Sequence, residues 1–477
     1  MLVARTKGGE PVLVDRLREM VQLASGLDAD GRLSPESRDR AIECLRRFGQ
    51  RLRHMDPSEV RAVGTNTLRA AVDAGEFLVD AERALGHSIE TISGIEEARL
   101  IFLGVTRTLS GPRRRRLVVD IGGGSTELIV GEGAPLEMES LYMGCITFSR
   151  AHFGDGRLTP ENWRRAELAA LQELEPVTER FRAIDWEEVA GASGTIRAID
   201  GLVRTYGWSR KGITAEALGR LRETLLKAGR VGRLKLEGLN PRRRTTIAGG
   251  AAILSALFEA LGIDVMRRSD GALREGLLYD FLGRIRDQDV RERGVEALAD
   301  RAHVDRQQAA RVKQTGLSLL AQVADGWDLG SRNARQFLSW AANLHEIGLD
   351  VAHSHYHRHG EYIVAHADLQ GFSLPEQQVL ATLVRSHRRK FPTEVITALP
   401  RNWSAWTERL AMPLRLSVVL HRSRSPLPLP PIELGTARNA LDLRFPPGWL
   451  DEHPLTRADL ETEAAYLREA GYRLSFG

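Results

Sequence analysis

Residues 117–131 read LVVDIGGGSTELIVG, and this stretch constrains the fold of the chain more than any other. Two runs of β-branched and apolar residues flank a turn with three consecutive glycines, a pattern that predicts a β-hairpin. Glycines leave the backbone N–H groups of such a turn uncovered, so the turn is suited to form a concave nest around a phosphate. The residues predicted to line this nest are Gly122, Gly123, Gly124 and Ser125.

Two carboxylates lie at the mouth of the predicted turn. Asp120 closes the first strand, and Glu127 opens the second. Acids beside a phosphate nest are useful when a hard cation lies between them, because Mg²⁺ prefers carboxylate and phosphate oxygens as ligands. We therefore predict a magnesium site at Asp120 and Glu127. The alternative is a glycine-rich hairpin that carries two solvated acids.

Length and composition limit the class of protein. A chain of 477 residues is too long for one hydrophobic core, so we expect two to four domains. Its 42% hydrophobic and 27% charged residues are ordinary for a globular protein. Two distant cysteines, Cys44 and Cys145, predict a reducing cytoplasm and no disulfide framework. The net charge is only +4, but most basic residues are arginines, whose guanidinium groups suit phosphate oxygens and favour a polyanionic partner.

Strand and helix patterns alternate over the first 285 residues, and the strand patterns then fade. Apolar spacing and helix caps predict helices at 35–53, 93–109, 161–181 and 247–261. Residues 290–420 have the spacing of helices throughout. A Ser- and Pro-rich segment at 423–431 is typical of a linker. The tail after it is expected to hold one or two strands near 440–445 and a helix at 457–470.

Three segments between a predicted strand and a predicted helix have the small polar residues of anion-binding loops. They are GTNTLR at 64–69, GASGT at 191–195 and SDGALREG at 269–276. Arg69, one turn into its helix, is placed to point at the same anion as the first loop. The residues predicted to contact phosphate are Gly64, Thr65, Asn66 and Thr67 in the first loop, and Ser193, Gly194 and Thr195 in the second. Helix capping is the alternative for each loop taken alone.

A fourth segment, SGIEEAR at 93–99, places two acids in the first turn of a predicted helix. Acids in this position usually interact with the helix dipole. The functional interpretation is that one of them orients or deprotonates water for attack on phosphorus.

Together these motifs resemble the exopolyphosphatase and guanosine-pentaphosphate phosphohydrolase family. The matching segments are GTNTLR (64–69), SGIEEARLIFLGV (93–105), DIGGGSTE (120–127), MGCITF (143–148), GASGTIRA (191–198), SDGALREG (269–276), LHEIGLDVAHSHYHRHG (344–360) and LVRSHRRK (383–390). The resemblance implies an α/β fold of two actin-like, ribonuclease-H-like lobes, then an α-helical HD-like domain and a small C-terminal α+β domain. The expected boundaries are 1–112, 113–287, 288–422 and 423–477.

The resemblance also implies roles for single residues in a cleft between the two lobes. Glu97 matches the acid that positions the attacking water, and Arg69 matches a basic residue that faces the transferred phosphate. Asp120 and Glu127 match the acids near Mg²⁺, and K⁺ is expected as a stimulating ion. The phosphate-loop residues that match are Gly123, Gly124, Ser125, Gly194 and Thr195.

Two activities within the family have to be separated. Exopolyphosphatases remove terminal phosphate from inorganic polyphosphate, whereas their relatives convert the pentaphosphate alarmone pppGpp to the tetraphosphate. Gly124 and Asp270 stand where alarmone hydrolases tend towards alanine and glycine, and the segments SHYHRHG and SHRRK are similar to the exopolyphosphatase branch. We therefore expect polyphosphate as the substrate, with pppGpp hydrolysis as the alternative. A non-catalytic protein that binds polyphosphate or (p)ppGpp is a second alternative.

Seven of the 13 histidines fall between His345 and His387. A metal-dependent HD phosphohydrolase pairs histidine with aspartate, whereas His345 is followed here by Glu346. The spacing resembles an HD helix that has lost its metal ligands. We expect a structural or polyanion-contacting role for these histidines rather than a second catalytic metal.

The family pattern at the start of the first lobe is close to DLGSNSFHMLVAR, and this sequence opens with MLVAR. Met1 therefore aligns with an internal methionine. A sheet without the preceding strand would leave backbone groups unpaired, so we expect the upstream reading frame to encode about twenty further residues with an Asp-x-Gly-Ser-Asn-like loop.

The expected partners are polyphosphate, (p)ppGpp, a second copy in a homodimer and the inner face of the cell membrane as a peripheral contact, with no nucleic acid.

Overall fold

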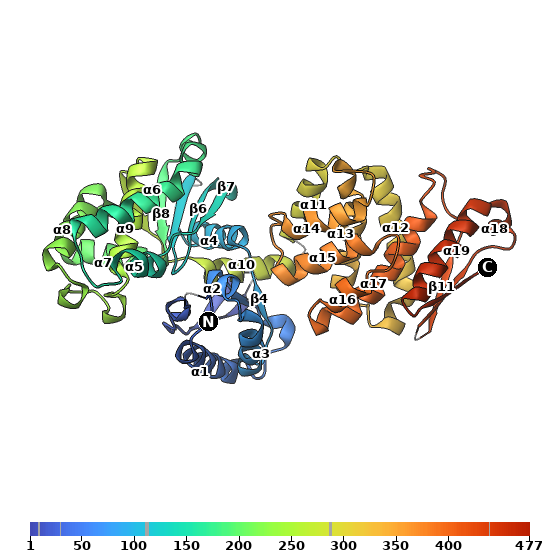
Figure 1. Ribbon diagram of the computed structural model, residues 1–477, viewed down its shortest axis with the longest axis horizontal. Coiled ribbons are helices and arrows are strands. Elements are labelled where there is room, and N and C mark those ends of the chain that lie inside the picture. The colour runs from blue at the N-terminus through green and yellow to red at the C-terminus, as the bar shows by residue number, and fades with distance from the viewer. Residues whose placement is uncertain (8–9, 29, 110–113, 286–288, 438) are drawn as a thin grey trace. The chain divides into compact units, whose positions relative to one another are not determined.

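The computed structural model describes all residues except 8–9, 29, 110–113, 286–288 and 438. The chain divides into two compact units, Met1–Gln288 and Asp289–Gly477 (Figure 1). Each unit has a hydrophobic core of its own. No helix within the described residues is both long and apolar enough to cross a membrane.

A six-stranded mixed sheet forms the centre of the first unit, with the strand order β7-β6-β5-β8-β10-β9. Its strands are β5 (Arg116–Ile121), β6 (Thr126–Glu132), β7 (Ala134–Leu141), β8 (Glu188–Ala192), β9 (Ile213–Thr214) and β10 (Val265–Arg268). β5 pairs antiparallel with β6 and parallel with β8, and it is buried along its whole length. Alternate β5 side chains face different cores: Leu117 and Val119 belong to the larger one and Val118 to the smaller one.

Helices cover both faces of this sheet, which explains why β5 is apolar throughout. The smaller core is closed by α4 (Gly94–Thr108) and by residues at the start of α10 (Leu273–Ile285). The larger core is closed by α5 (Cys145–Phe153), α6 (Pro160–Arg182), α7 (Ser193–Thr205), α8 (Ala215–Ala228) and α9 (Ile247–Leu261). Single-turn 3-10 helices occur at Val231–Arg233 and Pro241–Arg243.

The first 92 residues carry two separate two-stranded sheets and a small helical core. β1 (Leu2–Lys7) and β2 (Glu10–Arg16) are antiparallel, whereas β3 (Ala62–Gly64) and β4 (Ile89–Thr91) are parallel. The helices are α1 (Pro35–Leu52), α2 (Asn66–Ala70) and α3 (Ala74–Leu85), with 3-10 turns at Leu23–Gly26 and Pro57–Glu59. Ser34 caps α1 by accepting a hydrogen bond from the Ser37 amide, as expected for a helix that opens with Ser-Pro.

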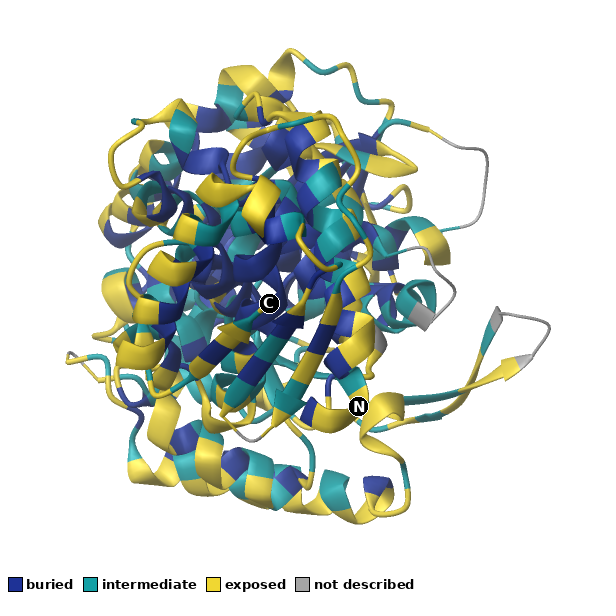
Figure 2. Cartoon of the chain, turned by 90° about the vertical axis from the view of Figure 1, so that its right-hand side faces the viewer, coloured by how far each residue is buried: buried dark blue, intermediate teal, exposed yellow. Residues whose placement is uncertain are grey.

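The second unit is helical, with a small sheet at its C-terminal end. Its elements are α11 (Val290–Arg301), α12 (Arg306–Trp327), α13 (Arg332–Leu344), a 3-10 turn (Ile347–Asp350), α14 (Tyr356–His366), α15 (Leu374–Ser386), α16 (Thr393–Thr397), α17 (Arg401–Leu420), β11 (Glu433–Ala437), β12 (Ala440–Arg444), α18 (Trp449–Glu452), α19 (Pro454–Glu469) and β13 (Arg473–Phe476). Leu434, Leu441 and Leu443 of the sheet share one core with the helices, and buried and exposed residues alternate along these strands (Figure 2).

The predicted helices and the hairpin at 117–131 are present, and the helix expected at 247–261 has these bounds in the structure. The tail differs from the prediction, since its sheet has three strands rather than one or two. β7 was also missed. Its sequence, APLEMESL, is polar because it is an edge strand and little of it is fully buried.

Candidate active site

Three carboxylates gather where the β5–β6 hairpin meets α4. Asp120 near the end of β5 pairs in register with Glu127 of β6, so both side chains leave the same face of the sheet. Glu97 lies in the first turn of α4, whose cap Ser93 accepts a hydrogen bond from the Glu96 amide over 3.1 Å. Asp120 is only 7% exposed, Glu127 1% and Glu97 8%.

The negative charges of these carboxylates oppose one another. Burial and the charge of Glu97 raise the pKa of Asp120 to about 7, while Arg197 acts in the opposite direction. Burial also raises the pKa of Glu127 well above its ordinary value, and Glu97 and Asp120 add to this effect. Burial raises the pKa of Glu97 despite the opposing charge of Arg69. Three buried acids that repel one another are an environment that a cation would stabilise.

A magnesium site here would rest on two carboxylates together with a bound substrate. Within the described residues, no three His, Cys, Asp or Glu side chains form a group that could hold a metal ion. Mg²⁺ is commonly bound through one or two carboxylates, several waters and the phosphates of the substrate. Asp120 and Glu127 fit this mode of binding.

Arg69 on α2 is the cation that faces the carboxylates. One of its guanidinium nitrogens donates to Glu97 over 3.1 Å and to the carbonyl oxygen of Ile92 over 2.8 Å. The Ile92 amide in turn donates to the carbonyl oxygen of Gly64 over 3.1 Å. The ends of β3 and β4 therefore fix the loop that carries Arg69 against the start of α4.

The glycine turn between β5 and β6 has engaged carbonyl groups. The carbonyl oxygens of Gly122 and Gly123 accept hydrogen bonds over 2.9 Å from the amides of Cys145 and Ile146, the first residues of α5. Within the described residues, the amides of Gly123, Gly124 and Ser125 donate no hydrogen bond, whereas the amide of Gly122 donates to the carbonyl oxygen of Ser125 over 2.9 Å. Three of the four amides of the predicted anion nest are therefore available to a ligand, and that of Gly122 is not.

The loop at 64–67 lies against this turn. A Cβ atom at Gly124 would clash with the side-chain oxygen of Asn66, so a larger residue there would displace the Asn66 side chain. Burial raises the pKa of Glu97, and a hydrogen bond from the Thr65 side chain opposes this rise. The remaining predicted contacts are Gly64, the last residue of β3, and Thr67, in the first turn of α2.

The junction of β8 and α7, where Ser193 directly follows the strand, has a strained backbone. Ser193 has a positive φ of 80°, which is uncommon for a residue with a side chain. Its hydroxyl oxygen accepts hydrogen bonds from the amides of Thr195 and Ile196, over 3.2 and 3.4 Å. A Cβ atom at Gly194 would clash with the guanidinium group of Arg243, so this arginine lies directly against the loop.

Sequence reasoning missed a cluster of arginines in the first unit. Burial and the positive charges of Arg274 and Arg16 lower the pKa of Arg18. Burial and the charge of Arg18 lower the pKa of Arg197. Burial also lowers the pKa of Arg243, and the charge of Arg197 adds to that effect. No ion pair is found within the described residues for Arg18, Arg197, Arg243 and Arg274.

One signal in the sequence could have revealed part of this cluster. An arginine lies within the first five residues of the helix after each predicted loop: Arg69, Arg197 and Arg274. Arg18 and Arg243 come from segments with no such pattern and are brought in only by the tertiary fold. Asp270, used in the sequence-based choice of substrate, is paired with Arg268 at 3.3 Å.

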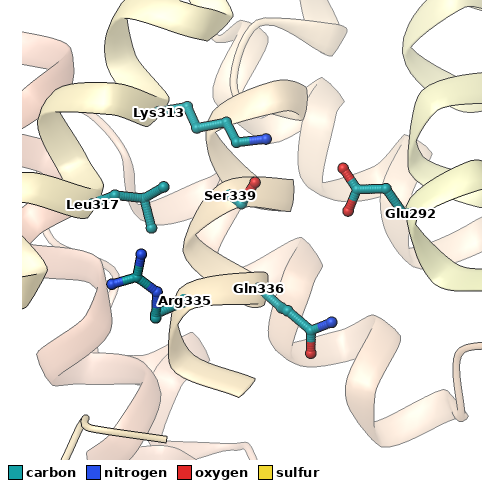
Figure 3. A pocket seen from close by; sticks show the side chains of 6 residues that line it. All are labelled: Glu292, Lys313, Leu317, Arg335, Gln336 and Ser339. Carbon is teal, nitrogen blue, oxygen red and sulfur yellow. The ribbon is translucent and has the colours of Figure 1, made fainter. Parts of the chain in front are cut away.

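The histidine-rich segment belongs to the second unit and forms a cluster of its own, in which His345 and His387 are buried. A separate pocket of about 270 Å³ opens on α11, α12 and α13 of the same unit (Figure 3). Glu292, Lys313, Leu317, Arg335, Gln336 and Ser339 line it, and none of them was predicted as a site residue.

Two family models match this chain. The model described as the Ppx/GppA phosphatase family matches residues 2–285, and the one described as Ppx/GppA phosphatase, domain III, matches residues 290–464. The expected family and the α/β fold of actin-like lobes with a helical C-terminal region are thereby confirmed.

Curated relatives and a solved structure are also similar to the chain. Two proteins named guanosine-5′-triphosphate,3′-diphosphate pyrophosphatase, from Aeromonas hydrophila subsp. hydrophila and Aeromonas salmonicida, are each 39% identical over 473 residues, covering 99% of this chain and 95% of the relative. A crystal structure described as an exopolyphosphatase from Cytophaga hutchinsonii superposes with a TM-score of 0.53 at 22% identity, covering 59% of this chain and 93% of that one. At this identity the structure supports the fold alone.

Proposed function

The chain belongs to the Ppx/GppA phosphatase family, and within that family we propose that it removes the 5′-terminal phosphate of guanosine 5′-triphosphate 3′-diphosphate, pppGpp. The observation that carries this choice is the near full-length similarity to the two Aeromonas proteins named for this nucleotide. It favours the alternative substrate of the sequence interpretation over polyphosphate.

The charge distribution of the first unit suits a substrate with two anionic groups. Arg69, the glycine turn and Mg²⁺ held by the buried carboxylates would bind the triphosphate end, where the bond breaks. The arginine cluster would bind the second phosphate group, because its guanidinium groups lack acid partners among the described residues and depress one another's pKa. A nucleotide with a 5′-triphosphate and a 3′-diphosphate has this double character.

Glu97 would orient and deprotonate the attacking water. Burial raises the pKa of its carboxyl group, and a base with a raised pKa is better matched to proton transfer near neutral pH. Arg69 lies 3.1 Å from the same carboxylate and would stabilise the charge of the phosphoryl group during transfer. The amides of Gly123, Gly124 and Ser125 would hold the phosphoryl oxygens.

Asp120 and Glu127 would hold Mg²⁺ together with the substrate phosphates. The ion would supply positive charge that offsets the charge of the phosphoryl oxygens. The two carboxylates would then be stabilised in their ionised forms, which burial and mutual repulsion disfavour in the protein alone.

Polyphosphate hydrolysis is the second candidate. Gly124 and Asp270, at positions where alarmone hydrolases tend towards alanine and glycine, favour it. The contact of Gly124 with the Asn66 side chain gives this motif a structural basis, because alanine would displace Asn66. The arginine cluster does not separate the candidates, since a long polyanion would also engage it.

The deciding experiment compares kcat/KM for pppGpp and for long-chain polyphosphate with one enzyme preparation at physiological salt. We expect pppGpp to be preferred by about tenfold or more, a difference in transition-state stabilisation of about 1.4 kcal/mol. A preference of similar size for polyphosphate would reverse the assignment. Phosphate release from neither substrate, combined with binding of both, would support the non-catalytic alternative.

The other expectations stay predictions. They are Mg²⁺ with K⁺ as a stimulating ion, a homodimer, a cytoplasmic location and peripheral contact with the membrane.

A further inference from the structure

A buried network of ion pairs surrounds Asp280 on α10. Its carboxylate accepts hydrogen bonds from Arg61 and Arg99 over 2.5 Å each and from Arg284 over 3.1 Å. Burial alone would raise the pKa of Asp280, but the charges of Arg99, Arg284 and Arg61 hold this pKa far below its ordinary value. Arg99 also binds Glu96 through two hydrogen bonds of 2.8 Å. The side chains of Arg61, Arg99 and Asp280 are 5%, 7% and 4% exposed.

Two partners of Asp280 lie on the segments that carry the two residues at the reaction centre. Arg61 immediately precedes β3, the strand that leads into the loop and helix of Arg69. Arg99 lies two residues after Glu97 on α4. One carboxylate therefore joins the segment that carries Arg69 to the segment that carries Glu97.

The helix that bears Asp280 is held firmly against α4 (Figure 1). A Cβ atom at Gly276 would clash with the carbonyl group of Leu100, and one at Gly104 would clash with that of Ala272. The two backbones are thus in direct contact, at a spacing that only glycine permits. With α10 and α4 fixed, the bond to Arg61 ties β3 to this pair, in addition to the hydrogen bonds that Ile92 makes with Gly64 and Arg69.

We propose that Asp280 is a positioning residue for the phosphatase reaction: it holds β3 on the α4–α10 pair and thereby sets the approach of Arg69 to Glu97. This inference rests on the proposed function and deepens it. A buried ion network is weak evidence for stability, because desolvation cancels much of the attraction between the charges. The network joins the segments of the reaction centre, so its role is to position Arg69 relative to Glu97.

The test is the variant Asp280→Asn, assayed with pppGpp and Mg²⁺. We expect kcat to fall by about tenfold to a hundredfold, as for a small misplacement of a reacting group. The acid limb of the kcat profile should also move to higher pH. Burial raises the pKa of Glu97, which also faces Asp120 and Glu127, and the charge of Arg69 opposes this rise, so a looser contact with Arg69 raises the pKa further and protonates the base at higher pH.

Two further variants keep the test decisive. Glu463→Gln breaks a comparably buried pair with Arg415 in the second unit, 2.5 and 2.9 Å long, and should lower the melting temperature without moving the acid limb. Arg61→Lys keeps the positive charge but loses the guanidinium fork, so it should show a smaller shift of the acid limb in the same direction. This variant replaces Asp280→Asn in the test if the latter does not fold. A folded Asp280→Asn or Arg61→Lys variant with the wild-type kcat and acid limb would overturn the proposal.

Failure of the proposed function has a different signature. If the wild-type chain hydrolyses neither pppGpp nor polyphosphate, crystal structures of the wild type and of Asp280→Asn, or of Arg61→Lys if the former does not fold, test the positioning role directly. The proposal requires the 3.1 Å separation of Arg69 and Glu97 to lengthen in the variant. An unchanged separation would refute it.

Discussion

Each unit of this protein buries a cluster of titratable side chains, and the two clusters differ in charge. In the first unit, Glu97, Asp120 and Glu127 repel one another, and Asp120 has a pKa of about 7. In the second unit, burial lowers the pKa of His345 and of His387, so both rings are neutral near pH 7. Binding of a cation or a proton would reduce the repulsion within the carboxylate cluster. The imidazole rings carry no charge to begin with.

The hydrogen bonds of the histidines agree with this difference. Nδ1 of His345 and of His387 is paired with the carbonyl oxygens of Ala342 and Val384, over 2.7 and 2.5 Å, and the two rings meet edge to face at 5.4 Å. Nε2 of each ring makes no hydrogen bond within the described residues, and that of His345 lies 4.0 Å from the Glu346 carboxylate. A neutral ring needs no counter-ion, so burial by itself does not mark a ligand site. Burial of like charges that remain ionisable is the more specific sign.

The largest expected effect tests whether the carboxylate cluster is catalytic. Glu97→Gln should lower kcat for pppGpp by about two to four orders of magnitude, as for the loss of a general base. Its melting temperature should not fall, because the change removes one of three repelling charges. Steady-state kinetics and thermal unfolding of the same preparation measure both effects. Wild-type turnover in this variant would make Glu97 a helix-capping acid.

The second prediction asks whether a cation relieves the repulsion. Asp120→Asn and Glu127→Gln should each raise the Mg²⁺ concentration for half-maximal activity by about tenfold or more, since each removes a carboxylate ligand. In the absence of metal, both variants should melt no lower than the wild type. Titrations of activity and of melting temperature with Mg²⁺ measure these effects, and Glu161→Gln at the start of α6 is a control outside the cluster. Unchanged Mg²⁺ titrations in both variants would make the two acids structural.

The third prediction concerns the cations of the first unit. Arg243→Gln should raise KM for pppGpp about tenfold with little change in kcat, because it removes a charge-assisted contact made in the ground state and the transition state alike. Arg220→Gln is the matched control, since Arg220 is exposed and paired with Glu216 on α8. Equal KM values in both variants would show that Arg243 does not contact the substrate.

The smallest effect tests the neutral state of the histidines. The folded-state pKa of His387 lies below its unfolded value of about 6.5, so the unfolded chain takes up the proton as pH falls, and stability is lost below that pH. Lowering the pH from 7 to 5.5 should therefore reduce the unfolding free energy of the wild type by about 1 kcal/mol more than that of His387→Leu. Urea unfolding followed by tryptophan fluorescence measures it. His353→Gln, an exposed change, is the control, and equal pH dependence in all three proteins would contradict the prediction.

Sequence reasoning reached the elements whose structure is decided locally. Strong apolar spacing located α9, and the run of glycines between two apolar segments located the β5–β6 hairpin together with Asp120 and Glu127. The arginine cluster was out of reach because its members are far apart along the chain and converge only through tertiary packing. The sequence also held no sign that Asp280 joins Arg61 to Arg99, since ion pairs between distant segments leave no periodic pattern.

The engaged carbonyl groups of the glycine turn have a consequence for inhibitor chemistry. The carbonyl oxygens of Gly122 and Gly123 accept hydrogen bonds from the start of α5, so the turn presents the free N–H donors of Gly123, Gly124 and Ser125 beside two engaged acceptors. A substrate mimic whose terminal group keeps acceptor oxygens, such as a vanadate or sulfate ester, matches this surface. A mimic that ends in an amide or a methyl group places a donor or an apolar atom against N–H groups and leaves them unsatisfied.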